Sequence, residues 1–116
     1  MSYDIRLIKA AKQDFLKLDG SQKELVAKAL KKVAQNPLPQ SEGGYGKPLG
    51  NHATTSLAGL LKIKLKKSGI RIVYKLIQQQ GQMVVIVIGM RADSAVYKAA
   101  QQRIKTLYRK NPQKFT

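Results

Sequence analysis

The sequence predicts an α+β fold: a small, mostly antiparallel sheet with an N-terminal helical hairpin packed on one face and a helix at the C-terminus. Two neighbouring runs, residues 61–66 and 70–76, alternate apolar side chains with others, which is typical of half-buried strands. Ser68-Gly69 between them is a turn signal. Residues 83–88 are apolar at every position, which predicts a central strand covered on both faces. The predicted element order is βααβββα.

The N-terminal part supplies the first strand and the helical hairpin. Tyr3–Ile8 alternates and predicts a strand. Residues 10–18 carry apolar side chains at helical spacing, and Asp19-Gly20 ends that helix. Ser21-Gln22-Lys23-Glu24 has the spacing of a capping box, which predicts that the second helix begins at Ser21. Asn36-Pro37 ends it.

The C-terminal part supplies the remaining strands and the last helix. We expect strands near residues 57–66, 70–77 and 83–88, and then a helix from about Ala95 to Arg109, capped by Asp93 or Ser94. A chain of 116 residues is the length of one domain. We therefore expect a single domain over residues 1–110 and a frayed C-terminal tail over residues 111–116.

The charge of the chain predicts a polyanionic partner. Lysine and arginine number 22 against 6 acidic residues, for a formal net charge of +16, and Asp93 is the only acid after Glu42. Nucleic acid, an acidic protein or an anionic membrane could each neutralise such a surface. The chain has no cysteine, which excludes disulfides and thiolate chemistry. It has no apolar run of transmembrane length and no signal-peptide pattern, so we expect a cytoplasmic protein.

The register of the predicted hairpin gathers cations on one sheet face. Side chains directly opposite each other share a face, so the apolar residues of the two strands must be paired with one another. A turn at Ser68-Gly69 achieves this with Lys66 opposite Arg71, and a turn at Lys67-Ser68 achieves it with Lys64 opposite Arg71. In either register one face carries Lys62, Lys64, Lys66 and Arg71.

The residue types in the sequence allow few kinds of catalytic chemistry. His52 is the only histidine, which excludes a pair of histidines acting as acid and base, and the six acids show no paired or clustered spacing for a metal. No serine lies in a nucleophile elbow. Lysine, arginine and tyrosine remain. They can cut RNA without a metal if the ribose 2′-OH is the nucleophile and the cations stabilise charge that develops on the phosphate. Crowded cations generally lower the pKa of lysine and tyrosine side chains, which favours proton transfer.

The chain resembles the RelE-type toxins of bacterial toxin–antitoxin systems, which are ribosome-dependent mRNA endonucleases. The resemblance covers about residues 3–104. It rests on the order and spacing of these segments: Lys47-Pro48-Leu49-Gly50, Lys62-Ile63-Lys64-Leu65, Ser68-Gly69-Ile70-Arg71-Ile72-Val73-Tyr74, Gly89-Met90-Arg91 and Val96-Tyr97.

The resemblance implies a function and a set of site residues. It implies cleavage of mRNA in the ribosomal A site, which leaves a 2′,3′-cyclic phosphate and a 5′-OH, by catalytic residues that match Lys62, Lys64, Arg71, Arg91 and Tyr97. It also implies that Tyr97 stacks on or orients the substrate base. We assign general RNA-binding charge to Lys47, Lys66, Lys67 and Lys75. The implied partners are mRNA, the ribosome with its rRNA and an acidic antitoxin; no metal, other cofactor or membrane is implied.

Two other functions stay open from the residues alone. A ParE-like toxin has the same fold but poisons DNA gyrase by binding protein, and it lacks the nuclease residues. A non-catalytic RNA-binding module would need only the basic surface. The presence of all five catalytic positions favours the nuclease.

Overall fold

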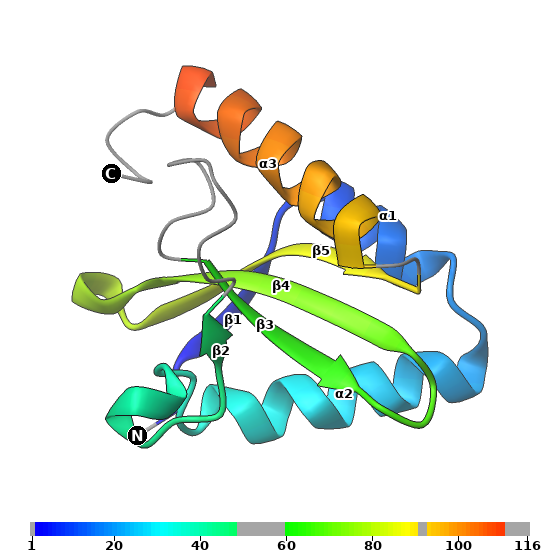
Figure 1. Cartoon of the computed structure of the whole chain (residues 1–116), viewed down its shortest axis with the longest axis horizontal. Coiled ribbons are helices and arrows are strands. Elements are labelled where there is room, and N and C mark those ends of the chain that lie inside the picture. Colours follow the sequence, from blue (N-terminus) through cyan, green and yellow to red (C-terminus); the bar gives the residue numbers. More distant parts are fainter. Residues whose placement is uncertain (1, 49–59, 91–92, 111–116) are drawn as a thin grey trace.

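The computed structural model describes residues 2–48, 60–90 and 93–110. The predictions for Arg91, His52, the strand start at residues 57–59 and the tail at residues 111–116 therefore lie outside the described residues. The chain runs through the following elements (Figure 1): β1 (Asp4–Leu7), α1 (Lys9–Leu16), α2 (Gly20–Ala34), β2 (Lys47–Pro48), β3 (Leu60–Leu65), β4 (Ile70–Ile77), β5 (Gln82–Gly89) and α3 (Asp93–Lys110). This confirms the α+β class, and the short strand β2 is an addition to the predicted elements.

The five strands form one sheet in the order β1-β5-β4-β3-β2. Every neighbouring pair is antiparallel except β1 with β5, which is parallel. Strand β5 lies between β1 and β4, and its residues 83–88 are all buried. The prediction of a central strand that is covered on both faces is confirmed, since β5 buries side chains in the core on each face of the sheet.

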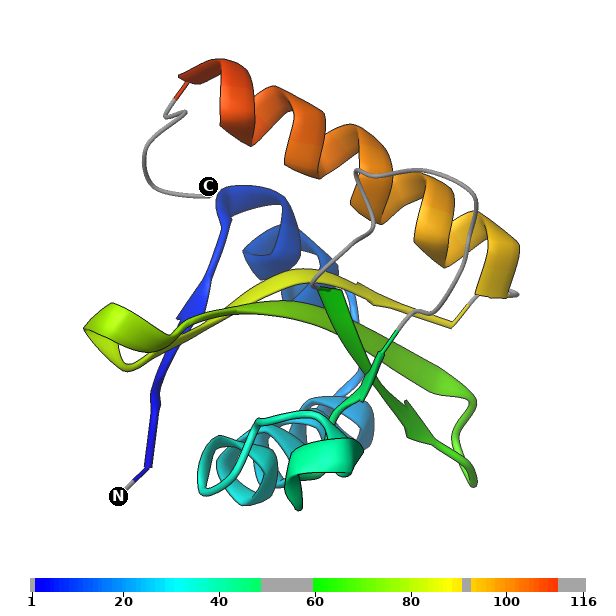
Figure 2. The same cartoon turned by 60° about the vertical axis from the view of Figure 1, so that its left-hand side comes forward.

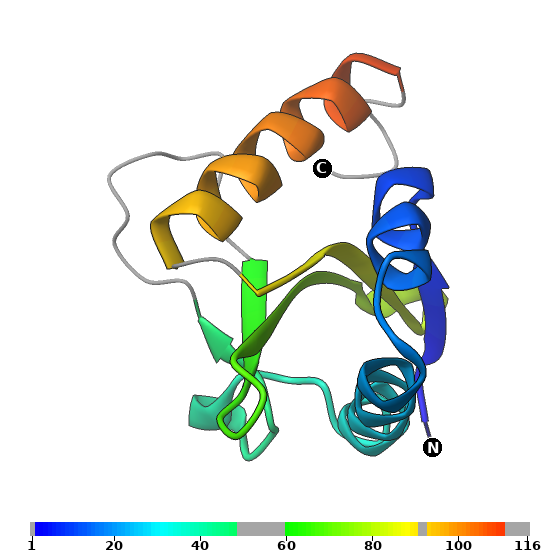
Figure 3. The same ribbon diagram turned by 90° about the vertical axis from the view of Figure 1, so that its right-hand side faces the viewer.

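The two faces of the sheet belong to two separate cores. On one face, α2 packs Val26, Leu30 and Val33 against the side of the sheet that carries Ile72 and Tyr74. On the other face, α3 packs against Val73, Val84 and Ile86 through Val96, Tyr97, Ala100 and Ile104. Figures 2 and 3 show α3 and α2 on opposite sides of the sheet, with α1 beside it near β1. None of the helices in the described ranges is long and apolar enough to cross a bilayer.

The second helix begins at a different residue from the one predicted. Its N-cap is Asp19, whose carboxylate accepts a hydrogen bond from the Gln22 backbone N–H at 2.8 Å, while the Gln22 side chain accepts from the Asp19 N–H at 3.1 Å. The prediction that Ser21 caps the helix was wrong. Ser21 lies inside the first turn, where its hydroxyl donates to Asp19 at 2.9 Å. The hydrogen bonds from Gln22 and Ser21 lower the pKa of Asp19, because they favour its charged form.

The β3–β4 hairpin has the second of the two predicted registers. Lys64 lies opposite Arg71 and Leu65 opposite Ile70, so residues 66–69 form the connection. Gly69 ends this turn with φ +75° and donates its N–H to the Leu65 carbonyl at 2.8 Å. A left-handed conformation favours glycine there, since a side chain would be strained. Lys66 lies in the turn and has no partner position on β4.

A buried tyrosine fixes the loop that leads into β2. The Tyr74 hydroxyl donates to the Pro37 carbonyl at 2.8 Å, and burial raises the pKa of Tyr74 well above its ordinary value. A Cβ on Gly46 would lie 2.3 Å from this hydroxyl oxygen, so glycine is required by close approach. The consequence is a defined position for the next residue, Lys47, at the start of β2.

Candidate functional site

Three strands place five cations on one face of the sheet, the face that α3 covers in part. Lys47 on β2 is opposite Lys62 on β3, and Lys64 is opposite Arg71 on β4. Opposite residues share a face, and Lys75 follows by the same alternation. We call these residues the cationic face: Lys47, Lys62, Lys64, Arg71 and Lys75. The prediction that Lys62, Lys64 and Arg71 share a face is confirmed, whereas Lys66, predicted on the same face, lies in the turn beyond the last paired residues, Leu65 and Ile70. No Asp or Glu occurs in strands β2 to β5, so the charge of the face is uniform.

A contact between β3 and α3 forms the centre of the candidate site. The Lys62 ammonium donates a hydrogen bond to the Tyr97 hydroxyl oxygen at 2.6 Å. Its nitrogen lies 5.3 Å from the ring centroid, so the ammonium meets the ring at the hydroxyl end. The two groups come from distant parts of the sequence, and they meet because α3 packs on β5 and β4, on the same face of the sheet as Lys62. A hydrogen bond to a charged donor is shorter and stronger than a neutral one, which makes this contact a specific one.

The burial of Tyr97 bears on its role. Its side chain is only 7% exposed and packs among apolar residues of β4, β5 and α3. A ring in this position offers its hydroxyl to the cationic face, and its aromatic surface is used for packing. In this conformation the hydroxyl, hydrogen bonded to Lys62, is therefore the chemically available group. Base stacking, which the resemblance implies, would require the ring to leave the core.

Lys64 and Arg71 form a second pair of neighbouring cations. Directly opposite residues of antiparallel strands have Cβ atoms about 4.5–5.5 Å apart. The Arg71 guanidinium is partly held in place, because its Nη1 donates to the Gly69 carbonyl in the hairpin turn at 3.1 Å. Lys64 is exposed. An anchored guanidinium beside an exposed ammonium is suited to binding a phosphate.

Of the four lysines predicted to bind RNA, two lie in the β3–β4 turn and two lie on the cationic face. Lys66 and Lys67 are exposed in the β3–β4 turn. Lys75 is half-buried on the cationic face, opposite Leu60. Lys47 is exposed and directly opposite Lys62, which places it nearer to the Lys62–Tyr97 contact than the sequence suggested. Arg91 follows β5 but lies outside the described residues.

One ion pair was missed by the sequence interpretation. Arg103 of α3 and Asp14 of α1 form a bidentate pair, with N–O distances of 2.6 and 3.2 Å. The signal was present, because Arg103 continues the apolar stripe of α3 that contains Val96 and Ala100. A charged residue in such a stripe needs a partner. Asp14 has no such signal, because the six acids of the sequence show no paired or clustered spacing.

The chemistry of the site comes from lysine, arginine and tyrosine. Across the ranges that the structure describes, no group of three or more His, Cys, Asp or Glu residues could hold a metal ion. The residues gathered on the cationic face can bind phosphate, and the Lys62–Tyr97 pair can exchange a proton with a substrate.

Comparisons with known proteins point to one family. No family model matches the sequence. The mRNA interferase toxin RelE of Escherichia coli K12 is 31% identical over 104 residues, which cover 90% of this chain and 99% of the relative. A structure of an E. coli RelE variant in the free state is similar with a TM-score of 0.71 and 29% identity, over 90% of this chain and 99% of that one. A chain of the intact E. coli RelBE toxin–antitoxin complex is similar with a TM-score of 0.60 and 26% identity, over 78% of this chain and 99% of that one.

Proposed function

Since the chain belongs to the RelE toxin family, we propose that it is an endoribonuclease toxin that cuts mRNA in the ribosomal A site. The family assignment confirms the resemblance that the sequence motifs carried. The observation that supports the proposal most directly is the 2.6 Å contact between the Lys62 ammonium and the Tyr97 hydroxyl on a uniformly cationic sheet face. The named relative with 31% identity is an mRNA interferase.

The proposed reaction uses the RNA's own nucleophile. The ribose 2′-OH attacks the adjacent phosphorus, and the bond from phosphorus to the 5′-oxygen of the next nucleotide breaks. A base accepts the 2′-OH proton and an acid donates a proton to the leaving oxygen. The products are a 2′,3′-cyclic phosphate and a 5′-OH. The protein must supply position, proton transfer and stabilisation of the charge on the phosphate oxygens.

The five residues predicted to be catalytic divide this work by their chemistry. A guanidinium stays protonated and binds phosphate oxygens as a fork, so we assign Arg71 and Arg91 to holding the scissile phosphate. Lysine can gain and lose a proton, so we assign proton transfer to Lys62 and Lys64. Tyr97 fixes the Lys62 ammonium through its hydroxyl and can relay a proton to or from it.

The remaining basic residues support binding to the ribosome. We propose that Lys47, Lys66, Lys67 and Lys75 contact RNA phosphates around the cut, and that the net charge of +16 adds attraction to rRNA. A chain that works on ribosomes acts in the cytoplasm. We propose that its second partner is an acidic antitoxin, because a structural relative is in complex with its antitoxin and because acidic contacts would neutralise the surface that binds RNA.

The experiment that tests this function is primer extension on an mRNA translated by purified ribosomes. Cleavage within the A-site codon, with a 5′-OH on the downstream fragment, is the expected result. Naked RNA should stay intact under the same conditions. Supercoiled DNA with gyrase is the control for a ParE-like activity, and covalent gyrase–DNA complexes without RNA cleavage would contradict the proposal.

We also expect cleavage to be independent of transition metals, since the described residues offer no cluster of metal ligands. A chelator selective for transition metals should leave the single-turnover rate unchanged while Mg²⁺ keeps the ribosomes intact. Loss of activity that Mn²⁺ or Zn²⁺ restores would show that this part of the proposal is wrong.

A further inference from the structure

We propose that Arg103 is a positioning residue: its ion pair with Asp14 fixes where α3 lies on the sheet and thereby holds the Tyr97 hydroxyl against Lys62. The idea rests on the proposed function, because it gives Arg103 a role in the same site. The hydrogen bonds of Arg103 go to Asp14 and to the Ile86 carbonyl, so we assign it an indirect role through α3.

Arg103 connects three elements through one side chain. Its Nη1 donates to the Asp14 carboxylate of α1 at 2.6 Å and to the Ile86 carbonyl of β5 at 2.8 Å, and its Nη2 donates to Asp14 at 3.2 Å. Asp14 in turn accepts from the Ile88 backbone N–H of β5 at 3.1 Å. Both charged side chains are partly shielded from solvent, with exposed fractions of 25% and 17%. Directional bonds of this kind fix both the rotation and the translation of a helix.

The position of the pair follows from the end of β1. Strand β1 pairs with β5 only as far as Leu7 opposite Val85, after which the chain turns into α1. Beyond that point no strand of the described ranges pairs with this edge of β5. A bulge in β5 follows at once, because Val73 pairs with Val87 while Tyr74 pairs with Val85. Buried backbone groups need partners, and the Asp14–Arg103 pair supplies them where a strand is missing.

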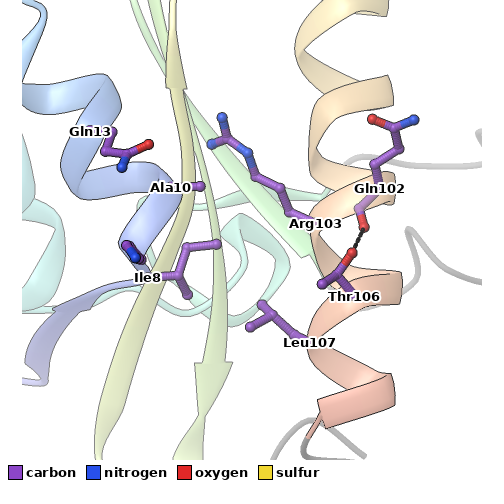
Figure 4. A pocket seen from close by; sticks show the side chains of 8 residues that line it. Ile8, Ala10, Gln13, Gln102, Arg103, Thr106 and Leu107 are labelled. Atoms are coloured by element: carbon purple, nitrogen blue, oxygen red, sulfur yellow. Dashed lines mark hydrogen bonds between the residues drawn. The ribbon is translucent and has the colours of Figure 1, made fainter.

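Two cavities that open to solvent flank the ion pair where α1 faces α3. A cavity of about 420 Å³ lies on one side of Arg103, between Ile8 and Gln13 of the first helical region and Leu107 of α3. Figure 4 shows the Arg103 side chain reaching from α3 across this space toward α1. A second cavity of about 410 Å³ on the other side is lined by Leu18 and Ala99 among others, and also by Arg103. Between these two cavities, the ion pair joins α1 to α3 through directional hydrogen bonds.

The link from Arg103 to the site is the helix itself. Tyr97 precedes Arg103 by six residues on α3, which is about 9 Å along a rigid helix axis. The other contacts of α3 with the sheet are apolar, through Val96, Ala100 and Ile104 among others, and apolar burial is not directional. Loss of the ion pair should therefore let α3 shift and lengthen the contact between Tyr97 and Lys62.

The test compares Arg103→Gln with Arg109→Gln, which removes the same charge from an exposed position on the same helix. The first readout is the NMR spectrum of ¹³C-labelled tyrosine rings, with the Tyr97 signals assigned from Tyr97→Phe. The second is the single-turnover cleavage rate on saturating ribosome complexes. Arg103→Gln should shift the Tyr97 signals and lower the rate by roughly 10–10²-fold, at most as much as loss of the Tyr97 hydroxyl, as expected when a reacting group is misplaced. Arg109→Gln should do neither.

A double-mutant cycle separates positioning from a general loss of stability. In a Tyr97→Phe background, Arg103→Gln should cost little further rate, because its target hydroxyl is already gone. If circular dichroism shows that Arg103→Gln is unfolded, the comparison uses Asp14→Asn instead. The amide keeps the shape of the side chain and weakens the ion pair.

Unchanged Tyr97 signals in a folded variant, or additive losses of rate, would overturn the role of Arg103. Wild-type protein without cleavage would overturn the proposed function instead, and the NMR comparison would still decide where α3 lies.

Discussion

At the scale of single residues, the account depends on how Tyr97 is used. Its ring is packed in the α3 core and its hydroxyl accepts a hydrogen bond from Lys62. Tyr97→Phe keeps the packing and removes the hydroxyl together with that bond. Because hydrogen bonds to charged groups contribute about 1.5–3 kcal/mol, we expect the single-turnover rate to fall by roughly 10–10²-fold. The variant should still fold, because the packing of the ring is kept, and its urea midpoint should fall by no more than this one hydrogen bond contributes. Full activity of Tyr97→Phe would mean that the hydroxyl has no part in cleavage.

Arg71 should behave as a phosphate clamp. Arg71→Lys keeps the positive charge but loses the fork and the hydrogen bond to the Gly69 carbonyl, so partial activity should remain. Arg71→Ala should cost more, on the order of 10²–10³ in rate, by analogy with removal of one donor to an oxyanion. Both variants should lower the pH–rate profile uniformly without changing its shape. A changed shape would indicate that Arg71 affects proton transfer, contrary to the assignment.

At the scale of elements, the cap of α2 gives a pH-dependent prediction. Hydrogen bonds from Gln22 and Ser21 lower the pKa of Asp19 from its ordinary value of 3.8. A carboxyl with a lowered pKa stabilises the fold above its unfolded pKa, and this contribution is lost as the pH falls through the folded value. Asp19→Ala should therefore have a lower urea midpoint than wild type at pH 7. The difference should shrink below about pH 4. A difference that is constant over this range would show that the charge of Asp19 is not what stabilises the helix.

The sequence predicts an element correctly where its pattern of apolar and polar residues is compatible with only one arrangement. Only registers that pair the apolar residues of β3 and β4 are compatible with a buried face, so the shared face of Lys62, Lys64 and Arg71 followed from alternation alone. The choice between the two possible turns did not follow, because both satisfy that condition. The cap of α2 was misplaced for a similar reason: Asp19 with Gln22 and Ser21 with Glu24 have the same spacing, and the pattern does not rank them.

The contacts that the sequence could not predict depend on how distant elements meet. The contact between Lys62 and Tyr97 requires the position of α3 on the sheet, and the pairing of Lys47 with Lys62 requires the short strand β2. The requirement for Gly46 became visible only when Tyr74 was found against it. None of these has a local sequence signal.

At the scale of the whole molecule, the two faces of the sheet differ in their roles. The face under α2 carries the apolar core that stabilises the fold, and the other face combines the core of α3 with the cationic face. A net charge of +16 attracts any polyanion, so charge alone does not distinguish a nuclease from an RNA-binding module. The distinction lies in whether particular cations act on the rate of cleavage after the RNA is bound.

The most direct measurement is therefore the single-turnover cleavage rate of ribosome-bound mRNA at saturating protein, compared between Lys62→Met and Lys67→Met. Both variants lose one lysine charge, but Lys62 contacts Tyr97 while Lys67 is exposed in the hairpin turn. We predict that Lys62→Met is slower than wild type by roughly 10²–10⁴-fold with ribosome binding retained, and that Lys67→Met cleaves at nearly the wild-type rate. Equal rates for the two variants would contradict the assignment of catalysis to the Lys62–Tyr97 contact.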